Sequence, residues 1–385
     1  MNAGKIWART LAWLAGLCGL AALAAGQSAR AQEVPQYKVD PTWPKQLPHN
    51  WITGGIGGID VDKDDPIWVV HRALSISKEE VGAAQKPPLY PECCLPAPAV
   101  LEFDQAGNVL QAWGGPGWVP DWPYEEHSVY VDRENNVWLG GNGPLGRGAP
   151  DRQILKFTNN GKKLLLELGH PSMDAENNQN TTLLGGPAGL VVDEAAHEVY
   201  IADGYVNKRV VVYDSDSGAF KRGWGAYGVP LTDITNGSGP PPDPLEAADE
   251  FTGPVHCVHI SVDNFVYVCD REGDRIQVFT KQGKYVQEIL AAWQTHVLGS
   301  LCAMAFSHDP KQKYIFVAGC GNNVIWIMNR FDGEVVGTIG QSGGNMGEFS
   351  NIHVMTVDSH GNLYTGETGN KRVQRFVLQN GTDKP

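Results

Sequence analysis

A short phrase recurs along this chain and limits its fold more than any other feature. It consists of an apolar run, an Asp or an equivalent residue in a tight turn, and a second apolar run that ends in small residues. Each copy is followed by another pair of strand-like segments. The copies span 58–72, 127–142, 189–205, 259–271, 304–321 and 353–367. One four-stranded unit cannot bury both of its faces alone, so this repetition predicts a β-propeller.

We expect six blades, at about 55–114, 123–169, 186–225, 254–290, 300–340 and 351–379. The last blade lacks one strand, and the segment YKVD (37–40) could supply it and close the ring without a free sheet edge. The prediction is therefore an all-β fold, a six-bladed β-propeller closed by an N-terminal strand, which occupies 32–385 as a single domain.

Residues 1–31 have the pattern of a secretory signal peptide. Basic residues precede an apolar stretch over 11–25, and 29–31 have the A-x-A form of a cleavage site. The apolar stretch is shorter than the roughly 20 residues that a transmembrane helix needs. Cleavage would remove three positive charges and change the formal net charge from −13 to −16. We therefore expect a periplasmic or secreted protein that is not membrane-bound after cleavage and, being acidic, does not bind nucleic acid.

Six of the seven cysteines follow the predicted signal peptide. An even number in an exported chain favours disulfides. Cys93 and Cys94 are adjacent, and both a vicinal disulfide and a reduced pair are open. The other four lie on strand pairs that a tight turn makes neighbours: Cys257 with Cys269, and Cys302 with Cys320. The spacing of a haem attachment motif or of a four-cysteine zinc site is absent from the sequence.

The long connections of the predicted blades share one face. The turns after the first and third strands of each blade are short, whereas long segments follow the second or fourth strand. Turns of a propeller blade alternate between two faces, so the long segments at 73–98, 143–152, 170–185 and 226–253 lie together. Pro/Gly-rich insertions can be merely tolerated, but four on one face of a rigid scaffold favour a ligand site there.

Three histidines are placed to meet at the propeller axis. His127 and His353 each lie five residues before the Asp of their first turn, so both begin an innermost strand on the elaborated face. In the fourth blade the position five residues before Asp263 is Val258, and a one-residue bulge would bring His256 level with the other two. Each histidine alone could be a hydrogen-bonded strand residue, but three in alternate blades favour a metal.

Alternate blades are evenly spaced around a six-membered ring, so the three imidazoles would converge from three directions. This arrangement suits a three-His zinc site with an open fourth position, although imidazole also accepts iron, cobalt and copper. Four polar residues would surround the metal at the ends of second strands: Arg72, Tyr205, Arg271 and Glu367. A Tyr beside a metal can act as a base, and an Arg fork matches a carboxylate. The arginines could instead pair with acidic neighbours such as Glu79 and Asp274.

Three segments carry a resemblance to a known family. ADGYVNKRV (202–210) is similar to the segment that bears the catalytic Tyr of the peptidyl-α-hydroxyglycine α-amidating lyases, which are NHL-repeat propellers. VVHRALS (69–75) and CDREGDRIQVF (269–279) are similar to two Arg-bearing segments of the same lyases. The resemblance implies six blades and a zinc ion held by three histidines from alternate blades. It implies zinc ligands at His127, His256 and His353, and catalytic residues at Tyr205, Arg72 and Arg271.

The chain also departs from these lyases. Val354 stands where the lyases carry a calcium-binding Asp, so the resemblance does not extend to a structural calcium ion. Val206 replaces the Cys that follows the catalytic Tyr, and Asn351 replaces a Met near the last His. The insertion 73–98 has no counterpart. The resemblance is therefore consistent with a different substrate at a retained metal site.

The sequence favours an exported, metal-dependent, lyase-like enzyme that acts on a small substrate with a hydroxyl group, such as an α-hydroxy amide. A zinc-dependent hydrolase, in which the metal activates water, is an alternative. A non-catalytic NHL propeller that binds a protein or small-molecule partner is another alternative. A flat, metal-free face with exposed aromatic residues such as Trp118 and Trp122 would favour it. A calcium-dependent lactonase would need several carboxylate ligands at the axis, where the sequence places mainly His and small residues.

Overall fold

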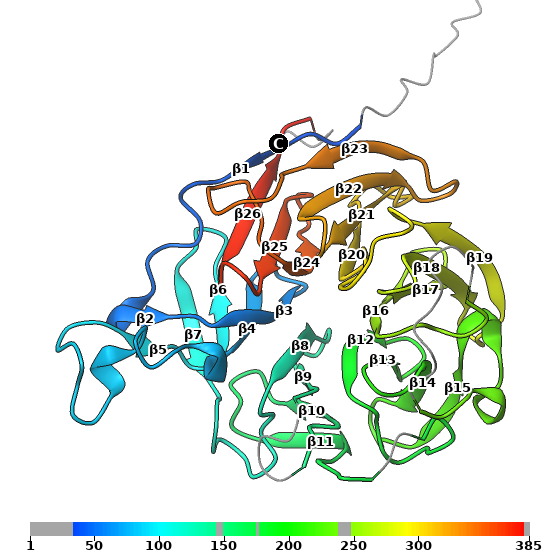
Figure 1. The fold of residues 1–385 in the computed structure, drawn as a ribbon, viewed down its shortest axis with the longest axis horizontal. Coiled ribbons are helices and arrows are strands. Elements are labelled where there is room, and N and C mark those ends of the chain that lie inside the picture. The colour runs from blue at the N-terminus through cyan, green and yellow to red at the C-terminus, as the bar shows by residue number, and fades with distance from the viewer. Residues whose placement is uncertain (1–33, 144–148, 175–176, 238–247, 381–385) are drawn as a thin grey trace, which may run out of the picture. The chain divides into compact units, whose positions relative to one another are not determined.

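The structure is a computed structural model that describes residues 34–143, 149–174, 177–237 and 248–380. Its six four-stranded sheets are arranged as blades around a central axis (Figure 1). The predicted all-β, six-bladed propeller is confirmed. The predicted signal peptide at 1–31 lies outside the described residues, so the proposed domain boundary stays a prediction.

The strands of each blade follow one another outward from the axis. Blade 1 contains β3 (Gly55–Val61), β4 (Ile67–Arg72), β6 (Val100–Phe103) and β7 (Val109–Trp113). Blade 2 contains β8 (Glu126–Val131), β9 (Val137–Gly141), β10 (Gln153–Phe157) and β11 (Leu164–Gly169). Blade 3 contains β12 (Pro187–Asp193), β13 (Glu198–Asp203), β14 (Arg209–Asp214) and β15 (Phe220–Trp224).

The second half of the ring repeats this order. Blade 4 contains β16 (Val255–Ile260), β17 (Phe265–Asp270), β18 (Arg275–Thr280) and β19 (Tyr285–Leu290). Blade 5 contains β20 (Ala303–Phe306), β21 (Tyr314–Gly319), β22 (Val324–Asn329) and β23 (Val335–Ile339). Blade 6 contains β24 (Ile352–Val357), β25 (Leu363–Glu367), β26 (Val373–Leu378) and β1 (Tyr37–Val39).

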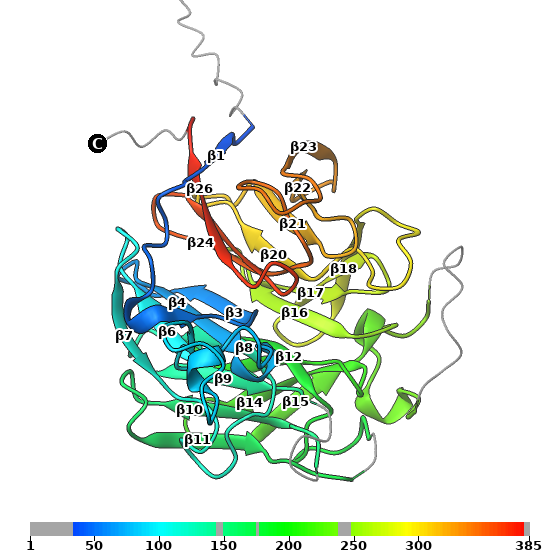
Figure 2. The same cartoon turned by 60° about the vertical axis from the view of Figure 1, so that its left-hand side comes forward.

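An N-terminal strand closes the ring, as predicted. β1 pairs antiparallel with β26, with Tyr37 opposite Leu378, and the two strands lie side by side in both views (Figures 1 and 2). The insertion 73–98 is tied to the same end of the chain, because β5 (Leu95–Pro96) pairs in parallel with β2 (Trp51–Ile52). Closure leaves the sixth blade with four strands like the others and covers the outer edge of β26.

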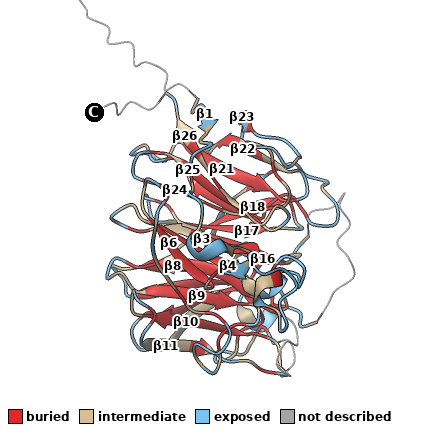
Figure 3. Cartoon of the chain, turned by 90° about the vertical axis from the view of Figure 1, so that its left-hand side faces the viewer, coloured by how far each residue is buried: buried red, intermediate tan, exposed pale blue. Residues whose placement is uncertain are grey.

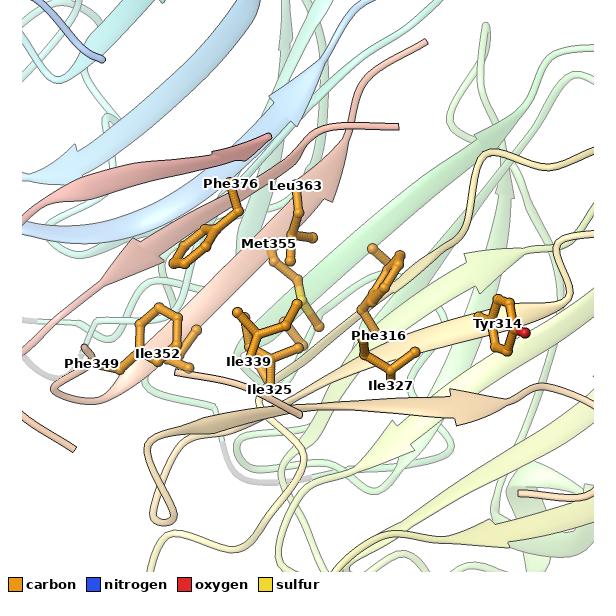
Figure 4. Close-up of a cluster of buried hydrophobic side chains, with 13 residues drawn as sticks. Tyr314, Phe316, Ile325, Ile327, Ile339, Phe349, Ile352, Met355, Leu363 and Phe376 are labelled. Carbon is orange, nitrogen blue, oxygen red and sulfur yellow. The ribbon is translucent and has the colours of Figure 1, made fainter. Parts of the chain in front are cut away.

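Apolar side chains from neighbouring sheets form the cores between the blades. Figure 3 shows that the strands are mostly buried and the connections mostly exposed. Figure 4 shows the core between blades 5 and 6, where Phe316 and Ile327 face Met355 and Phe376. Each blade buries its faces only against its two neighbours, which is why the repeat in the sequence requires a closed ring.

In blades 1, 2 and 6, the Asp of the repeated phrase fixes the turn that follows the innermost strand. In blade 2 this residue is Asp132. Its Oδ1 accepts the backbone N–H groups of Glu134 and Asn136, and its Oδ2 accepts the indole N–H of Trp138 at 3.0 Å. Asp62 and Asp358 hold their turns in the same way. One side chain therefore joins the turn to the second strand and fixes where the innermost strand ends.

The cysteines pair as the strand positions predicted. Cys257 with Cys269 and Cys302 with Cys320 form disulfides, and Cys93 is bonded to Cys94. Disulfides persist in oxidising compartments, so these bridges fit an exported protein. Among the described residues, no helix has the length and apolar character needed to cross a membrane.

Candidate metal centre

The innermost strands share an irregularity that positions the site. The pairing of β3, β8, β12, β16 and β24 with their second strands shifts by one residue at the same place. A residue at such a bulge leaves the regular ladder and can be directed toward the axis. These bulge residues are Gly57, His127, Ala188, His256 and His353. Histidine therefore occupies the bulge of blades 2, 4 and 6, and a small residue occupies it in blades 1 and 3.

In the fourth blade the histidine lies five residues before the turn residue, as in blades 2 and 6. This corrects the prediction from the sequence, which measured the distance from Asp263. The backbone N–H of Ser261 donates to the carbonyl of Phe265 at 2.9 Å, just as Asp132 donates to Asn136 at 3.0 Å. Ser261, and not Asp263, is thus the counterpart of the turn Asp, and His256 lies five residues before it. The one-residue bulge expected at His256 is present, but it is not special to blade 4, because His127 and His353 lie at bulges too. The alignment on Asp263 was wrong, because a serine replaces the repeated Asp in this blade.

The structure brings the three histidines together. One ring nitrogen from each of them lies within 4.8 Å of the others. The Nε2 atoms of His127 and His353 are 3.1 Å apart, and the His256 ring centre is 5.0 Å from that of His127. All three side chains are buried, with exposed fractions of 1%, 3% and 5% for His127, His256 and His353.

The second ring nitrogen of each histidine is held by the backbone of the next blade. A carbonyl can only accept, so each Nδ1 carries the hydrogen and each Nε2 has a free lone pair. The distances from Nδ1 to oxygen are 2.9 Å for His127 to Ala188, 2.5 Å for His256 to Cys302, and 3.0 Å for His353 to Ile56. Three lone pairs therefore point to one place with fixed tautomers. This donor set fits a divalent transition metal.

The electrostatics keep these imidazoles neutral. Burial lowers the pKa of His127 and of His353 well below its ordinary value, and the positive charge of Arg72 lowers both further. Burial also lowers the pKa of His256 to about 3, with a further contribution from Arg271. A metal binds only the unprotonated ring, so the site is in its ligating state at neutral pH.

Tyr205 lies directly beside the histidines. Its hydroxyl oxygen is 2.8 Å from Nε2 of His127 and 3.2 Å from Nε2 of His256. Burial raises the pKa of this phenol, and the charges of Arg271 and Arg72 oppose that rise. The residue is still 38% exposed, so its ring reaches the solvent while its hydroxyl is at the centre.

The two predicted arginines flank this hydroxyl and the third histidine. Arg72 Nε donates to the carbonyl of Glu126 at 3.1 Å, and its Nη1 is 2.8 Å from a carboxylate oxygen of Glu125. Its Nη2 is 3.4 Å from Nε2 of His353. Arg72 is thus paired with Glu125, which the sequence did not single out, and not with Glu79.

Arg271 approaches from the other side. Its Nη1 lies 3.4 Å from the Tyr205 hydroxyl, and its guanidinium lies over the Tyr205 ring at 5.8 Å from the ring centre. Its Nη2 is 3.2 Å from Glu272, and its buried Nε has no hydrogen-bond partner among the described residues. The suggested partner Asp274 instead accepts the backbone N–H groups of Thr295 and Ser300.

Buried ion pairs hold the loops that carry Tyr205 and Arg271. Tyr205 lies between β13 and β14, and Arg209 Nε at the start of β14 binds Asp203 at the end of β13 at 2.8 Å. Both side chains are fully buried. Arg275 binds Asp270 in the same way across the loop of Arg271, at 2.9 Å.

A third ion pair of the same kind contains Glu367. This carboxylate is fully buried and binds Arg372 Nε at 2.8 Å, and it also accepts the backbone N–H of Ser350. It was predicted to surround the metal, but its partners give it a structural role in blade 6. The spacing of an acid followed by an Arg five or six residues later therefore identifies loop anchors.

Sequence reasoning missed the acidic pair that precedes His127. Glu125 holds Arg72, and Glu126 is buried, with one carboxylate oxygen 2.7 Å from the indole nitrogen of Trp122. Burial raises the pKa of Glu126 to about 7. The signal that could have found these residues is their position directly before a proposed ligand. Trp122 is itself buried, while Trp118 is 46% exposed, so only one of the two named aromatics is available to a partner.

Comparisons with known proteins identify proteins that are similar to this chain over most of its length. No family model matches the chain. NHL repeat-containing protein 3 of Mus musculus is 27% identical over 360 residues, which cover 90% of this chain and 85% of that protein. Peptidyl-glycine alpha-amidating monooxygenase of Mus musculus is 26% identical over 340 residues, which cover 85% of this chain but 30% of that longer protein.

Solved structures support the fold alone. A nutrient binding protein from Bacteroides thetaiotaomicron, described as auxiliary, superimposes with a TM-score of 0.56 at 11% identity, covering 90% of this chain and 78% of that one. A streptogramin B lyase superimposes with a TM-score of 0.51 at 14% identity, covering 91% of this chain and all of that one, 100%. At these identities the likeness carries no information about activity.

Proposed function

Because this chain is an NHL-type β-propeller that resembles the peptidylglycine amidating enzymes, we propose that it is a metal-dependent, lyase-like enzyme. Its substrate is a small molecule with a hydroxyl group, of the α-hydroxy amide type. The observation that carries the proposal is the position of the Tyr205 hydroxyl, 2.8 Å and 3.2 Å from two of three converging imidazole nitrogens. A phenol, three neutral imidazoles and two arginines form a set suited to removing a proton from a bound hydroxyl.

Zinc, or another divalent transition metal, would be held by His127, His256 and His353 and would make a substrate hydroxyl more acidic. Tyr205 is placed to accept the hydroxyl proton at its phenolic oxygen. Burial raises the pKa of that oxygen, and the charges of Arg271 and Arg72 oppose the rise and so favour the basic form that the step needs. In a substrate whose hydroxyl-bearing carbon is also bonded to the amide nitrogen, that C–N bond then breaks, the carbon becomes a carbonyl, and the proton passes to the departing amide nitrogen.

The two arginines differ in what they can do for the substrate. Arg72 is fixed by the Glu126 carbonyl and by Glu125, so it serves as a positioned charge beside His353. Arg271 has a buried Nε with no partner among the described residues, and its other nitrogens lie beside Tyr205 and Glu272. We assign the substrate carboxylate or the developing oxyanion to Arg271, because its Nε has no partner among the described residues, whereas the Nε of Arg72 donates to the Glu126 carbonyl.

Metal content and turnover test the proposal together. Elemental analysis of the purified protein should find about one metal ion per chain, and His127→Ala and His353→Ala should lose it. His197→Ala is the control, because this histidine is exposed and pairs with Asp216. α-Hydroxy amides are then screened for release of a carbonyl product and an amide. A wild-type protein that binds no added zinc, iron, cobalt or copper would contradict the metal centre.

The variant Tyr205→Phe separates binding from catalysis. It should keep the metal and lose turnover by about 10²–10⁴-fold, the usual contribution of a general base. Unchanged turnover would remove Tyr205 from the mechanism. A metal-loaded protein that hydrolyses esters or amides without an α-hydroxyl would support the hydrolase, in which the metal would activate water. A loaded protein inactive on all these substrates would support the non-catalytic, partner-binding propeller. We also propose that the protein is exported, on the basis of its disulfides.

A further inference from the structure

The end of the axis remote from the three histidines contains a cavity of about 390 Å³. Side chains of all six innermost strands line it, each two or more residues beyond the bulge position. Since a strand advances by roughly 3.3 Å per residue, the cavity residue His259 lies about 10 Å along β16 from His256. The volume is within the range of roughly 300–1,000 Å³ that small-molecule sites occupy. The cavity is therefore separate from the metal centre.

The wall of this cavity is mainly apolar. Its apolar members include Val129, Leu190, Ala305, Phe306, Met355 and Val357. No lysine or arginine is among the described residues that line it, whereas two aspartates, Asp60 and Asp309, are. Asp309 is satisfied by the Ser307 hydroxyl and by backbone N–H groups of the turn. The cavity therefore attracts an apolar body and repels an anion.

Asp60 on β3 is a carboxyl group of the cavity wall without a counter-charge. One of its oxygens accepts the backbone N–H of Val131 at 2.8 Å, which ties blade 1 to blade 2. The side chain also accepts the backbone N–H of Val61, but no lysine or arginine lines the cavity beside it. Burial, together with the nearby charge of Asp62, raises the pKa of Asp60 to about 7. A carboxylate in these surroundings lacks a counter-charge, and a cation would supply it.

His259 on β16 is a second polar group of the cavity wall. Blade 4 lies across the axis from blade 1, so this ring faces the cavity from the side opposite Asp60. It packs edge-on against Phe306, with ring centres 6.4 Å apart, and makes no hydrogen bond to a described residue. By contrast, the hydroxyl of Tyr130 in the same wall donates to the carbonyl of Val192. The cavity thus offers a carboxylate oxygen on one side and an imidazole on the other.

We propose that this cavity is a second binding site, specific for a small organic amine in its ammonium form. The ammonium group binds the carboxylate of Asp60, and a compact apolar body lies against Phe306 and Met355. An anion is excluded by the two aspartates, and a neutral alcohol can form a hydrogen bond but cannot neutralise the carboxylate. The site rests on the cavity, on the Asp60 carboxylate without a counter-charge and on the imidazole of His259, and it does not depend on the chemistry proposed for the three histidines.

Three molecules of equal length and different charge test the assignment. Titration calorimetry of the metal-loaded protein with hexylamine, hexanol and hexanoate measures binding directly. We expect hexylamine to bind at least roughly tenfold more tightly than hexanol, as a charge-assisted hydrogen bond predicts, and hexanoate not to bind. Equal binding of amine and alcohol, or no binding of the amine at millimolar concentration, would overturn the proposal.

Variants locate the binding and separate it from the metal. Asp60→Asn keeps an oxygen that can accept from Val131 and should remove the preference for the amine. Asp64→Asn, an exposed neighbour, should leave it unchanged. Ala305→Leu narrows the cavity from another wall and should weaken amine binding without touching Asp60. His127→Ala should bind the amine as tightly as the wild type, whereas loss of binding in this variant would place the amine at the metal centre and refute the second site.

Discussion

Removal of Arg209 should destabilise the propeller more than removal of any exposed lysine or arginine. The side chains of Arg209 and Asp203 are both fully buried, and the Arg209 guanidinium also donates to the backbone carbonyls of Asn178, Asn180 and Leu183. Arg209→Met therefore leaves a buried carboxylate without its counter-ion and three carbonyls without their donor. Breaking a buried pair in this way costs about 3–5 kcal/mol. Asp203 keeps the Asn207 amide and the Gly185 N–H as donors, so we expect the lower part of that range.

The assay is denaturant unfolding followed by tryptophan fluorescence. Lys63→Met is the control, because the pair of Lys63 with Asp64 is exposed and such pairs contribute about 0–1 kcal/mol. In the double variant Asp203→Asn/Arg209→Met no unpaired charge remains, so it should be more stable than Arg209→Met alone. If Arg209→Met costs no more than the control, or if the double variant is the less stable, the reasoning from burial is wrong. Loss of turnover without loss of metal in Arg209→Met would further link this pair to the position of Tyr205.

Three further predictions concern the metal, the pH and a disulfide. Removal of the metal by a chelator should lower the thermal midpoint of the wild type but not of His127→Ala, because a ligand stabilises only a state that binds it; an equal effect on both would argue against the centre. Burial lowers the folded-state pKa of His259 to about 4, below that of the unfolded chain, so this residue should cost stability as the pH falls from about 6.5 to 4. His259→Phe should therefore gain stability relative to the wild type at pH 4.5 compared with pH 7.5, and a constant difference in unfolding free energy would contradict this. Cys302→Ser/Cys320→Ser should lose about 2–4 kcal/mol and bind the metal more weakly, because the Cys302 carbonyl holds Nδ1 of His256. Metal affinity equal to that of the wild type would show that the backbone holds this carbonyl without the bridge.

The fold could be predicted because its cause is repeated in the sequence. Six copies of one turn, each with its Asp or a substitute, place six innermost strands, and a missing outer strand can be matched to the segment 37–40. The relation between Glu367 and the site could not be predicted in the same way. Its position at the end of a second strand resembles that of Arg72, but its side chain turns toward Arg372 within its own blade. The direction of a side chain at a strand end depends on its partners, which the repeat does not specify.

The cavity around Asp60 shows a further limit. Asp60, His259 and Met355 belong to three different blades and are far apart in the sequence, and each fits the alternation of its own strand. These three side chains come together only because the ring closes. Asp60 lacks a counter-charge because no blade places a lysine or arginine in the described lining of the cavity. A property that depends on six strands at once cannot be inferred from one copy of the repeat.

The bulge positions show how the repeat also builds the centre. Blades 2, 4 and 6 carry histidine there, and Gly57, Ala188 and Cys302 lie at the same distance from the turn in blades 1, 3 and 5. A side chain at Gly57 would meet the Glu126 carbonyl at 2.2 Å, so this position must be small for blade 2 to approach. The carbonyls of Ala188 and Cys302 at two of these positions, and that of Ile56 beside the third, accept from the three histidines. Small residues let neighbouring blades come close enough for that contact, which fixes each ring. The alternation of His with a small residue is therefore the sequence signal of the whole centre.

Gly57→Val should accordingly weaken metal binding, although this residue contributes no ligand. Unchanged metal affinity in a folded Gly57→Val protein would show that the close approach of the blades does not orient the histidines.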